Sequence, residues 1–208
     1  DGSVALFTTF TSANVVDSRA FRYVHGAGST AVSLPPGGVW SSPVALTDDG
    51  KVVLAVYGDN PDQALTRREI YLADYSTGSE ILTQLGSPNE RWNLPAGGIT
   101  GDGSVVAITS TGCGNALPNI CRYGYFHNAN GWFQLTSAMA AAGMDLTGWD
   151  RFQIQGISAD GTMVWGSGIH NGAEEGYVAE FLPANFLKNF DIVPEIASRS
   201  AGMPSAGV

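Results

Sequence analysis

The sequence has little charge, few basic residues and no long apolar run. Only 14% of its 208 residues are charged, and 10 Lys and Arg face 19 Asp and Glu, which gives a net charge of −9. Because nucleic-acid binding relies on clustered Lys and Arg, this balance predicts no nucleic-acid partner. No apolar run approaches the ~20 residues that a membrane-spanning helix needs, so no spanning segment is expected.

The familiar signatures of catalytic and cofactor sites are also missing. The sequence has no Gly-x-Ser-x-Gly elbow, phosphate-binding loop, His-Glu-x-x-His segment or cofactor-attachment motif. We therefore expect no cofactor and no resident metal. The absence makes catalysis less expected without excluding it, because an active site can be gathered from distant parts of a repeat protein.

Cysteine is scarce, with Cys113 and Cys121 as the only two. They close a short, turn-rich loop in which the two sulfurs can meet, which predicts a disulfide. The alternative is a pair of free thiols, since two cysteines match no zinc pattern without a second pair. A disulfide indicates an oxidising, extracytoplasmic location. The first residue is Asp1 rather than Met, so we expect upstream sequence, a signal peptide included, to precede it.

Glycine, by contrast, is abundant. With 27 Gly, 10 Pro and 44% hydrophobic residues, the composition favours many short strands joined by tight turns, which is an all-β protein. One short phrase recurs four times, as Asp-Gly-Ser-Val from Asp1, Asp-Gly-Lys-Val from Asp49, Asp-Gly-Ser-Val from Asp102 and Asp-Gly-Thr-Met from Asp160. Repeats of about 50 residues are typical of propeller blades.

Each repeat contains several apolar segments after its Asp-Gly pair. In the second repeat they fall at 52–57, 70–73, 80–83 and 97–100. We read them as four strands, the last closing the unit before the next Asp-Gly pair. The sequence therefore predicts a β-propeller-like array of about four four-stranded blades, with repeats starting near 1, 49, 102 and 160 and the last blade incomplete. This domain would span 1–184, and 185–208 would be a tail or linker.

The segments 143–149, 156–162 and 166–168 resemble the bacterial extracellular HAF repeats. An Asp-Gly turn, a strand, a Gly-rich loop and an aromatic second strand follow one another in all four units. The resemblance implies a secreted or surface-exposed, propeller-like protein without an assigned reaction. Repeats one to three depart from the pattern, because the glycine that ends the first strand is replaced by Phe10, follows Tyr57 as Gly58, or comes late as Gly112.

The loops divide into short and long ones. Turns from fourth to first and from second to third strands are short, and antiparallel pairing places them on one face. The opposite face would carry the long segments 11–19, 35–42, 58–68, 86–95, 110–121, 136–151 and 167–175, with a short helix at 137–143. Recognition usually uses long loops on a rigid scaffold. The Asp-Gly turns themselves are expected to be structural, with a calcium site as the alternative.

Three tryptophans occupy nearly equivalent places, 9 to 11 residues before the next repeat: Trp40, Trp92 and Trp149. They predict either a set of sugar-stacking platforms or wedges between neighbouring blades. Arg91 and Arg151 are the polar neighbours that a sugar would use, together with Asp150. A binding site on these residues would take a carbohydrate.

Histidine occurs three times. His25 and His127 follow matching second strands, which indicates turn structure. His170 is unduplicated and lies close to Glu174 and Glu175, so it serves in acid–base work, in metal binding or in a solvated loop. Carboxylates for glycoside hydrolysis are too numerous to pair from sequence: Asp17, Asp59, Asp62, Asp150, Glu174 and Glu175.

These features together predict a secreted or cell-surface bacterial propeller module that binds a carbohydrate or another protein chain, or is structural, without catalysis. One alternative is an extracellular polysaccharide lyase or hydrolase on the long-loop face. Another is a subunit of a larger surface assembly, because an incomplete last blade exposes an edge that needs covering.

Overall fold

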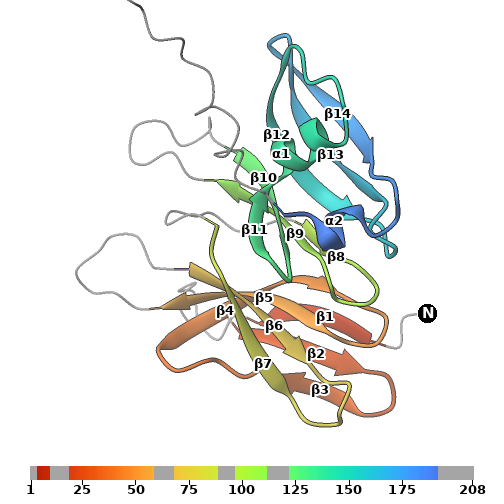
Figure 1. Cartoon of the computed structure of the whole chain (residues 1–208). Helices are drawn as coiled ribbons and strands as arrows, with labels where there is room; N and C mark the ends of the chain where they lie inside the picture. The colour runs from red at the N-terminus through yellow and green to blue at the C-terminus, as the bar shows by residue number, and fades with distance from the viewer. Residues whose placement is uncertain (1–3, 10–18, 59–67, 89–96, 112–121, 192–208) are drawn as a thin grey trace, which may run out of the picture.

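The computed structural model of the chain describes residues 4–9, 19–58, 68–88, 97–111 and 122–191. Their fourteen strands form four antiparallel sheets, accompanied by two short helices. Figure 1 shows the sheets following one another in chain order, from red through green to blue. Neither helix of the described residues has the length and apolar character that crossing a membrane requires.

The four sheets are named A to D in chain order. Sheet A contains β1 (Val4–Thr9), β2 (Arg19–Val24) and β3 (Gly28–Ala31). Sheet B contains β4 (Gly38–Leu46), β5 (Val52–Gly58), β6 (Arg68–Asp74) and β7 (Ile81–Gly86). Sheet C contains β8 (Gly97–Ile99), β9 (Val106–Thr111), β10 (Arg122–Asn128) and β11 (Gly131–Gln134). Sheet D contains β12 (Trp149–Ile157), β13 (Met163–His170) and β14 (Ala173–Glu180).

The sheets are offset by one strand from the sequence repeats. Each Asp-Gly turn is a hairpin inside one sheet, because β4 pairs with β5, β8 with β9 and β12 with β13. The strand expected to close one unit is therefore the first strand of the next sheet. Sheet D, the expected incomplete blade, has three strands among the described residues.

Residues 167–175 form a hairpin, so the expectation of a long loop there is wrong. β13 runs on to His170 and β14 begins at Ala173, with only Asn171 and Gly172 between them. Their φ angles are 50° and 87°. Two-residue hairpin turns require positive φ, and Asn-Gly is the pair that adopts it most readily.

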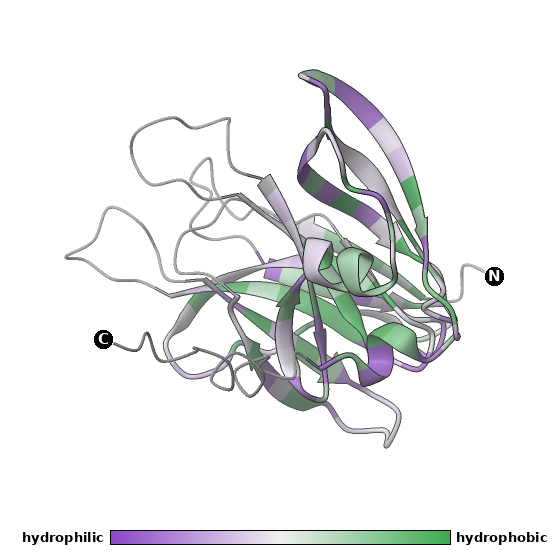
Figure 2. Cartoon of the chain, turned by 45° about the horizontal axis from the view of Figure 1, so that its top comes forward, coloured by the Kyte–Doolittle hydropathy of each residue, from purple (hydrophilic) through white to green (hydrophobic). Residues whose placement is uncertain are grey.

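Apolar residues gather at each junction between consecutive sheets. Both faces of β5 are buried, because sheet A covers one and sheet C the other, which explains its unbroken apolar run. On the sheet A side lie Val52, Leu54 and Val56, and on the sheet C side lie Val53, Ala55 and Tyr57. A third cluster, with Ala107, Phe126, Ile154 and Val164, joins sheets C and D. Figure 2 shows green, hydrophobic stretches along the strands of the sheets.

The expected helix is α1 (Leu135–Ala141), which begins two residues before the predicted start. It ends in a Schellman motif, because the N–H of Gly143 bonds the carbonyl of Ala140 and that of Met144 bonds Met139. Gly143 has φ 78°, which suits glycine at this position. The buried side of α1, at Leu135 and Ala138, covers the junction of sheets C and D.

The segment expected to be a tail or linker begins with a helical turn, α2 (Phe186–Asn189). It packs back on sheet C. The buried Asn128 amide at the end of β10 donates to the carbonyls of Leu187 and Phe190, each at 2.8 Å. The Phe190 ring meets Phe126 edge-on at 5.5 Å. The segment from α2 to Phe190 thus packs against β10 of sheet C.

Candidate functional site

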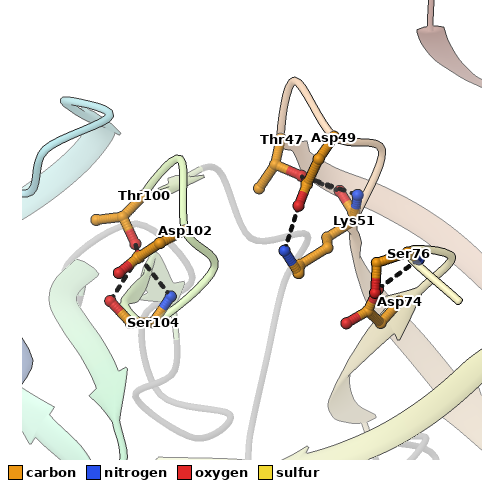
Figure 3. A network of polar contacts seen from close by, with 8 residues as sticks. All are labelled: Thr47, Asp49, Lys51, Asp74, Ser76, Thr100, Asp102 and Ser104. Carbon is orange, nitrogen blue, oxygen red and sulfur yellow. Dashed lines mark hydrogen bonds and ion pairs between the residues drawn. The ribbon is translucent and has the colours of Figure 1, made fainter.

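The three described Asp-Gly turns share one hydrogen-bond pattern. In each, a hydroxyl two residues before the Asp donates to the Asp carboxylate and accepts a backbone N–H from the residue entering the next strand. The hydroxyl and Asp pairs are Thr47 with Asp49, Thr100 with Asp102 and Ser158 with Asp160. The N–H groups belong to Lys51, Val105 and Met163. Figure 3 shows two of these turns side by side.

Neighbouring turns also contact each other. The N–H of Gly101 donates to the carbonyl of Ala159 at 2.7 Å, which joins the turns of sheets C and D. The Lys51 side chain bonds Asp49 and passes so close to Gly103 that a Cβ at that glycine would meet Lys51 Cδ at 2.9 Å. This rim is therefore a set of interlocked structural turns, as the sequence predicted.

The carboxylates of this rim are held ionised by their own turns. Hydrogen bonds from Ser104 and Lys188 hold the pKa of Asp102 far below its usual range. Bonds from Ser158 and Thr162 lower the pKa of Asp160 from 3.8 to about 2. Among the described residues, no group of three or more His, Cys, Asp and Glu side chains is placed to hold a metal ion.

The turn of sheet D is expected to make stability depend on acid pH. Because the folded pKa of Asp160 is about 2 and the reference value 3.8, its contribution is full above pH ~4 and is lost as pH falls towards 2. We expect the melting temperature of Asp160→Asn to lie below that of the wild type at pH 7, with the gap closing between pH 4 and 2. Differential scanning fluorimetry across this range measures the gap, and a constant gap would contradict the assignment.

The opposite rim of sheet D brings two of the sequence candidates, Trp149 and His170, together. β12 begins at Trp149 and β13 ends at His170, and these two residues are direct cross-strand partners. Their rings stack, with centroids 4.7 Å apart and planes 15° from parallel. The fit depends on Gly168, where a Cβ would meet the Trp149 ring at 3.2 Å. Trp149 also stacks on Phe152, which fixes the indole against the core.

Polar groups surround the stacked pair. His170 Nδ1 lies 3.2 Å from a carboxylate oxygen of Glu175 and the Asn171 amide nitrogen 3.2 Å from its Nε2. Arg151, in the left-handed region at φ 54°, donates from Nε to Asp150 at 2.8 Å. The His170, Glu175, Arg151 and Asp150 side chains are 31%, 48%, 28% and 62% exposed. The rim thus offers solvent an aromatic surface flanked by a carboxylate, an amide and a guanidinium.

The support beneath the rim is apolar and well packed. Tyr177 on β14 lies edge-on to Phe152 at 5.1 Å and donates its hydroxyl to the Gln153 carbonyl at 2.9 Å. Burial raises the pKa of Tyr177. The residues at the rim are therefore held on paired strands rather than on a free loop, which favours a preformed binding surface.

The other sequence candidates are placed differently. Trp40 on β4 stacks on its cross-strand partner Tyr57 and packs in the cluster between sheets B and C, which agrees with a wedge. His127, expected to be a turn residue, lies inside β10 and packs edge-on against Trp132, and burial lowers its pKa. Seven candidates lie outside the described residues: Asp17, Asp59, Asp62, Arg91, Trp92, Cys113 and Cys121.

Sequence reasoning placed Glu175 near His170 but missed Asn171, Phe152 and Tyr177. The signal for Asn171 was present, because Asn-Gly between two strand-like segments is the strongest short-range sign of a hairpin. Recognising it would have brought Glu175 opposite the end of β13. The stacking on Phe152 follows an irregularity of β12 between Asp150 and Gln153, which no sequence pattern announces.

Comparisons with known proteins inform the fold. No family model and no curated protein matches the chain. Among solved structures, TolB from Acinetobacter baumannii is similar, with a TM-score of 0.53 and 17% sequence identity. The chain has a β-propeller-like fold.

The superposition covers 86% of this chain and 38% of the TolB chain, so the protein spans well under half the length of that structure. At this identity the likeness concerns the fold alone. With no family model matching, the resemblance to HAF repeats stays a prediction.

Proposed function

We propose that the protein is an extracytoplasmic, non-catalytic binding module that takes a carbohydrate at the rim of sheet D. The observation that carries the proposal is the His170 ring stacked on Trp149 with Glu175 on one ring nitrogen and Asn171 near the other. Aromatic rings pack against the C–H faces of sugars, while carboxylate, amide and imidazole groups bond their hydroxyls.

Location and architecture support the same proposal. TolB, which shares the fold, is a periplasmic protein. The rim lies on the face opposite the interlocked Asp-Gly turns, and the 142–148 connection adjoins it, because the N–H of Asn171 donates to the carbonyl of Gly148 at 2.8 Å. A rigid scaffold that presents a partly exposed polar and aromatic surface is suited to recognition without turnover. We include in this proposal that the chain is a member of the HAF repeats and that Cys113 and Cys121 form a disulfide.

Glycan binding is expected to depend on His170. A glycan array identifies ligands for the wild type, and isothermal titration then compares variants. His170→Ala and Glu175→Gln should each weaken binding about tenfold, because one lost charge-assisted hydrogen bond corresponds to roughly 1.5 kcal/mol. The matched control is His25→Ala, an exposed histidine in the β2–β3 turn on the opposite rim, which should bind like the wild type.

Two results would contradict the proposal. The first is full binding by both rim variants, which would move the ligand elsewhere. The second is release of products from a panel of acidic and neutral polysaccharides by the wild type but not by His170→Ala. That outcome would favour the alternative of a polysaccharide-active enzyme with His170 as its base.

A further inference from the structure

The sheets pack in a series in which one face of each meets the next sheet. We call the side towards the next sheet the forward face and the other the backward face. In sheet B the forward face carries Val53, Ala55 and Tyr57, and these are at most 1% exposed. In sheet C it carries Val105 and Ala107, which are at most 2% exposed. Every interior junction thus joins a forward face to a backward face.

Sheet D has a forward face of the same kind that is exposed. Its Val164 is buried against sheet C, so the alternation of β13 turns Met163 and Trp165 forward. These two side chains are 43% and 39% exposed, and Val178, the cross-strand partner of Trp165, is 71% exposed. The Trp165 indole lies across Gly156 of β12, where it would overlap a Cβ. The result is an apolar surface at the position where the series would continue.

Sheet A has the complementary open surface. Leu6 packs towards sheet B, so Phe7 points backward, where it is 38% exposed and stacks on its partner Phe21 at 5.4 Å. Among the described residues, one forward face and one backward face are therefore unmatched. Each of these two faces is apolar, like the surface that the other kind of face contacts at the junctions inside the chain.

The charges at the edges of the two faces are opposite. Arg19 shares the backward face of sheet A with Phe21, two residues along β2, and it is exposed at the end of the strand that pairs with Thr9. Glu174 shares the forward face of sheet D with Val178 and pairs with Ile169, close to the end of β13. Both charges lie at the end of their sheets that is away from the Asp-Gly turns. Packing the two faces as in the interior brings Arg19 towards Glu174.

We propose that the forward face of sheet D binds the backward face of sheet A of a second copy of this chain. Two copies related by a twofold axis make this contact twice and close on themselves, so that no open face remains. The contact continues the series of sheet junctions across the boundary between the copies. It is independent of the ligand site, which lies at the rim.

Mass in solution tests the association. Sedimentation or light scattering should give twice the 21.7 kDa of one chain. Trp165→Glu and Phe7→Glu, each alone, should raise the dimer Kd at least ~tenfold. The control is Ile81→Glu, an exposed apolar position on β7 that belongs to neither face, and it should keep the wild-type mass. Far-ultraviolet circular dichroism and melting confirm that each variant folds.

Mixing the two variants tests which faces meet. The intact sheet D of Phe7→Glu should bind the intact sheet A of Trp165→Glu, so an equimolar mixture at ~100 μM should form a heterodimer with one contact while each variant alone stays monomeric. A dimer of either variant alone at the wild-type Kd would overturn the proposal, because the contact would then join like faces or lie elsewhere. A wild type that stays monomeric up to ~1 mM would also overturn it.

Discussion

Thr109→Val is expected to destabilise the protein by about 3 kcal/mol, because the side chain keeps its shape but two buried backbone groups lose the hydroxyl that links them to the neighbouring sheet. The Thr109 hydroxyl donates to the carbonyl of Ile154 at 2.8 Å and accepts the N–H of Ile154 at 2.6 Å. Both residues are buried, and Ile154 belongs to the first strand of sheet D. Urea unfolding followed by circular dichroism measures the loss, which corresponds to a fall in Tm of roughly 10 °C.

Thr109→Ser provides the matched control. It keeps the hydroxyl and removes one buried methyl, so the expected cost is only about 1 kcal/mol. The test is therefore which variant has the higher free energy of unfolding. Valine is more apolar than serine, so burial alone would make Thr109→Val the more stable variant. If Thr109→Val were as stable as the wild type, the bridge between β9 and β12 would be unimportant, and packing with the bond of Gly101 to Ala159 would hold sheets C and D together.

Gly166→Ala is expected to cost about 3 kcal/mol and to disturb the rim of sheet D, because the new methyl group meets backbone rather than a movable side chain. A Cβ at Gly166 would overlap the carbonyl oxygen of Gln153 and come within 3.1 Å of the Tyr177 hydroxyl. That hydroxyl is the group that bonds Gln153. Glycan binding should therefore weaken together with stability, which titration of the folded variant measures.

Gly176→Ala is the control for this prediction. Gly176 lies on the neighbouring strand and is exposed, and the nearest atom to its Cβ position is 3.8 Å away. We expect a change in unfolding free energy within about 0.5 kcal/mol. Equal effects of the two substitutions would show that the loss arises from strand propensity rather than from the close approach of β12 and β13.

The strands themselves were predictable, because β-branched and apolar runs after each Asp-Gly pair have few other structures available to them. Which strand begins each sheet was not predictable. The period of a repeat does not fix which strand begins a sheet. It therefore does not say whether the strand before Asp49 belongs to the preceding sheet or to the following one. The hydroxyl that precedes each Asp was visible in sequence at Thr47 and Thr100, but its double bonding becomes clear only when the two strands of the hairpin are paired.

The candidate site shows the same division. Trp149, Arg151 and His170 each stood out in the sequence, for separate reasons. The meeting of Trp149 with His170 depends on the register of β12 and β13, whereas Arg151 bonds Asp150 at an irregularity of β12. Register is set by the packing of one whole strand face and by turn length, so it cannot be read from the spacing of single residues.

The bonds of Asn128 to the segment near α2 also bear on how the chain folds as it is synthesised. Sheet C is complete by Gln134, yet the carbonyls that satisfy the Asn128 amide belong to residues 59 and 62 positions further along. The junction of sheets A and B has no such dependence, because its cluster contains no residue beyond Leu82, and only the other face of β5 needs sheet C to cover it. On a ribosome, the first half of the protein can therefore settle early, while the second half waits for its last helical turn to emerge and finish the fold.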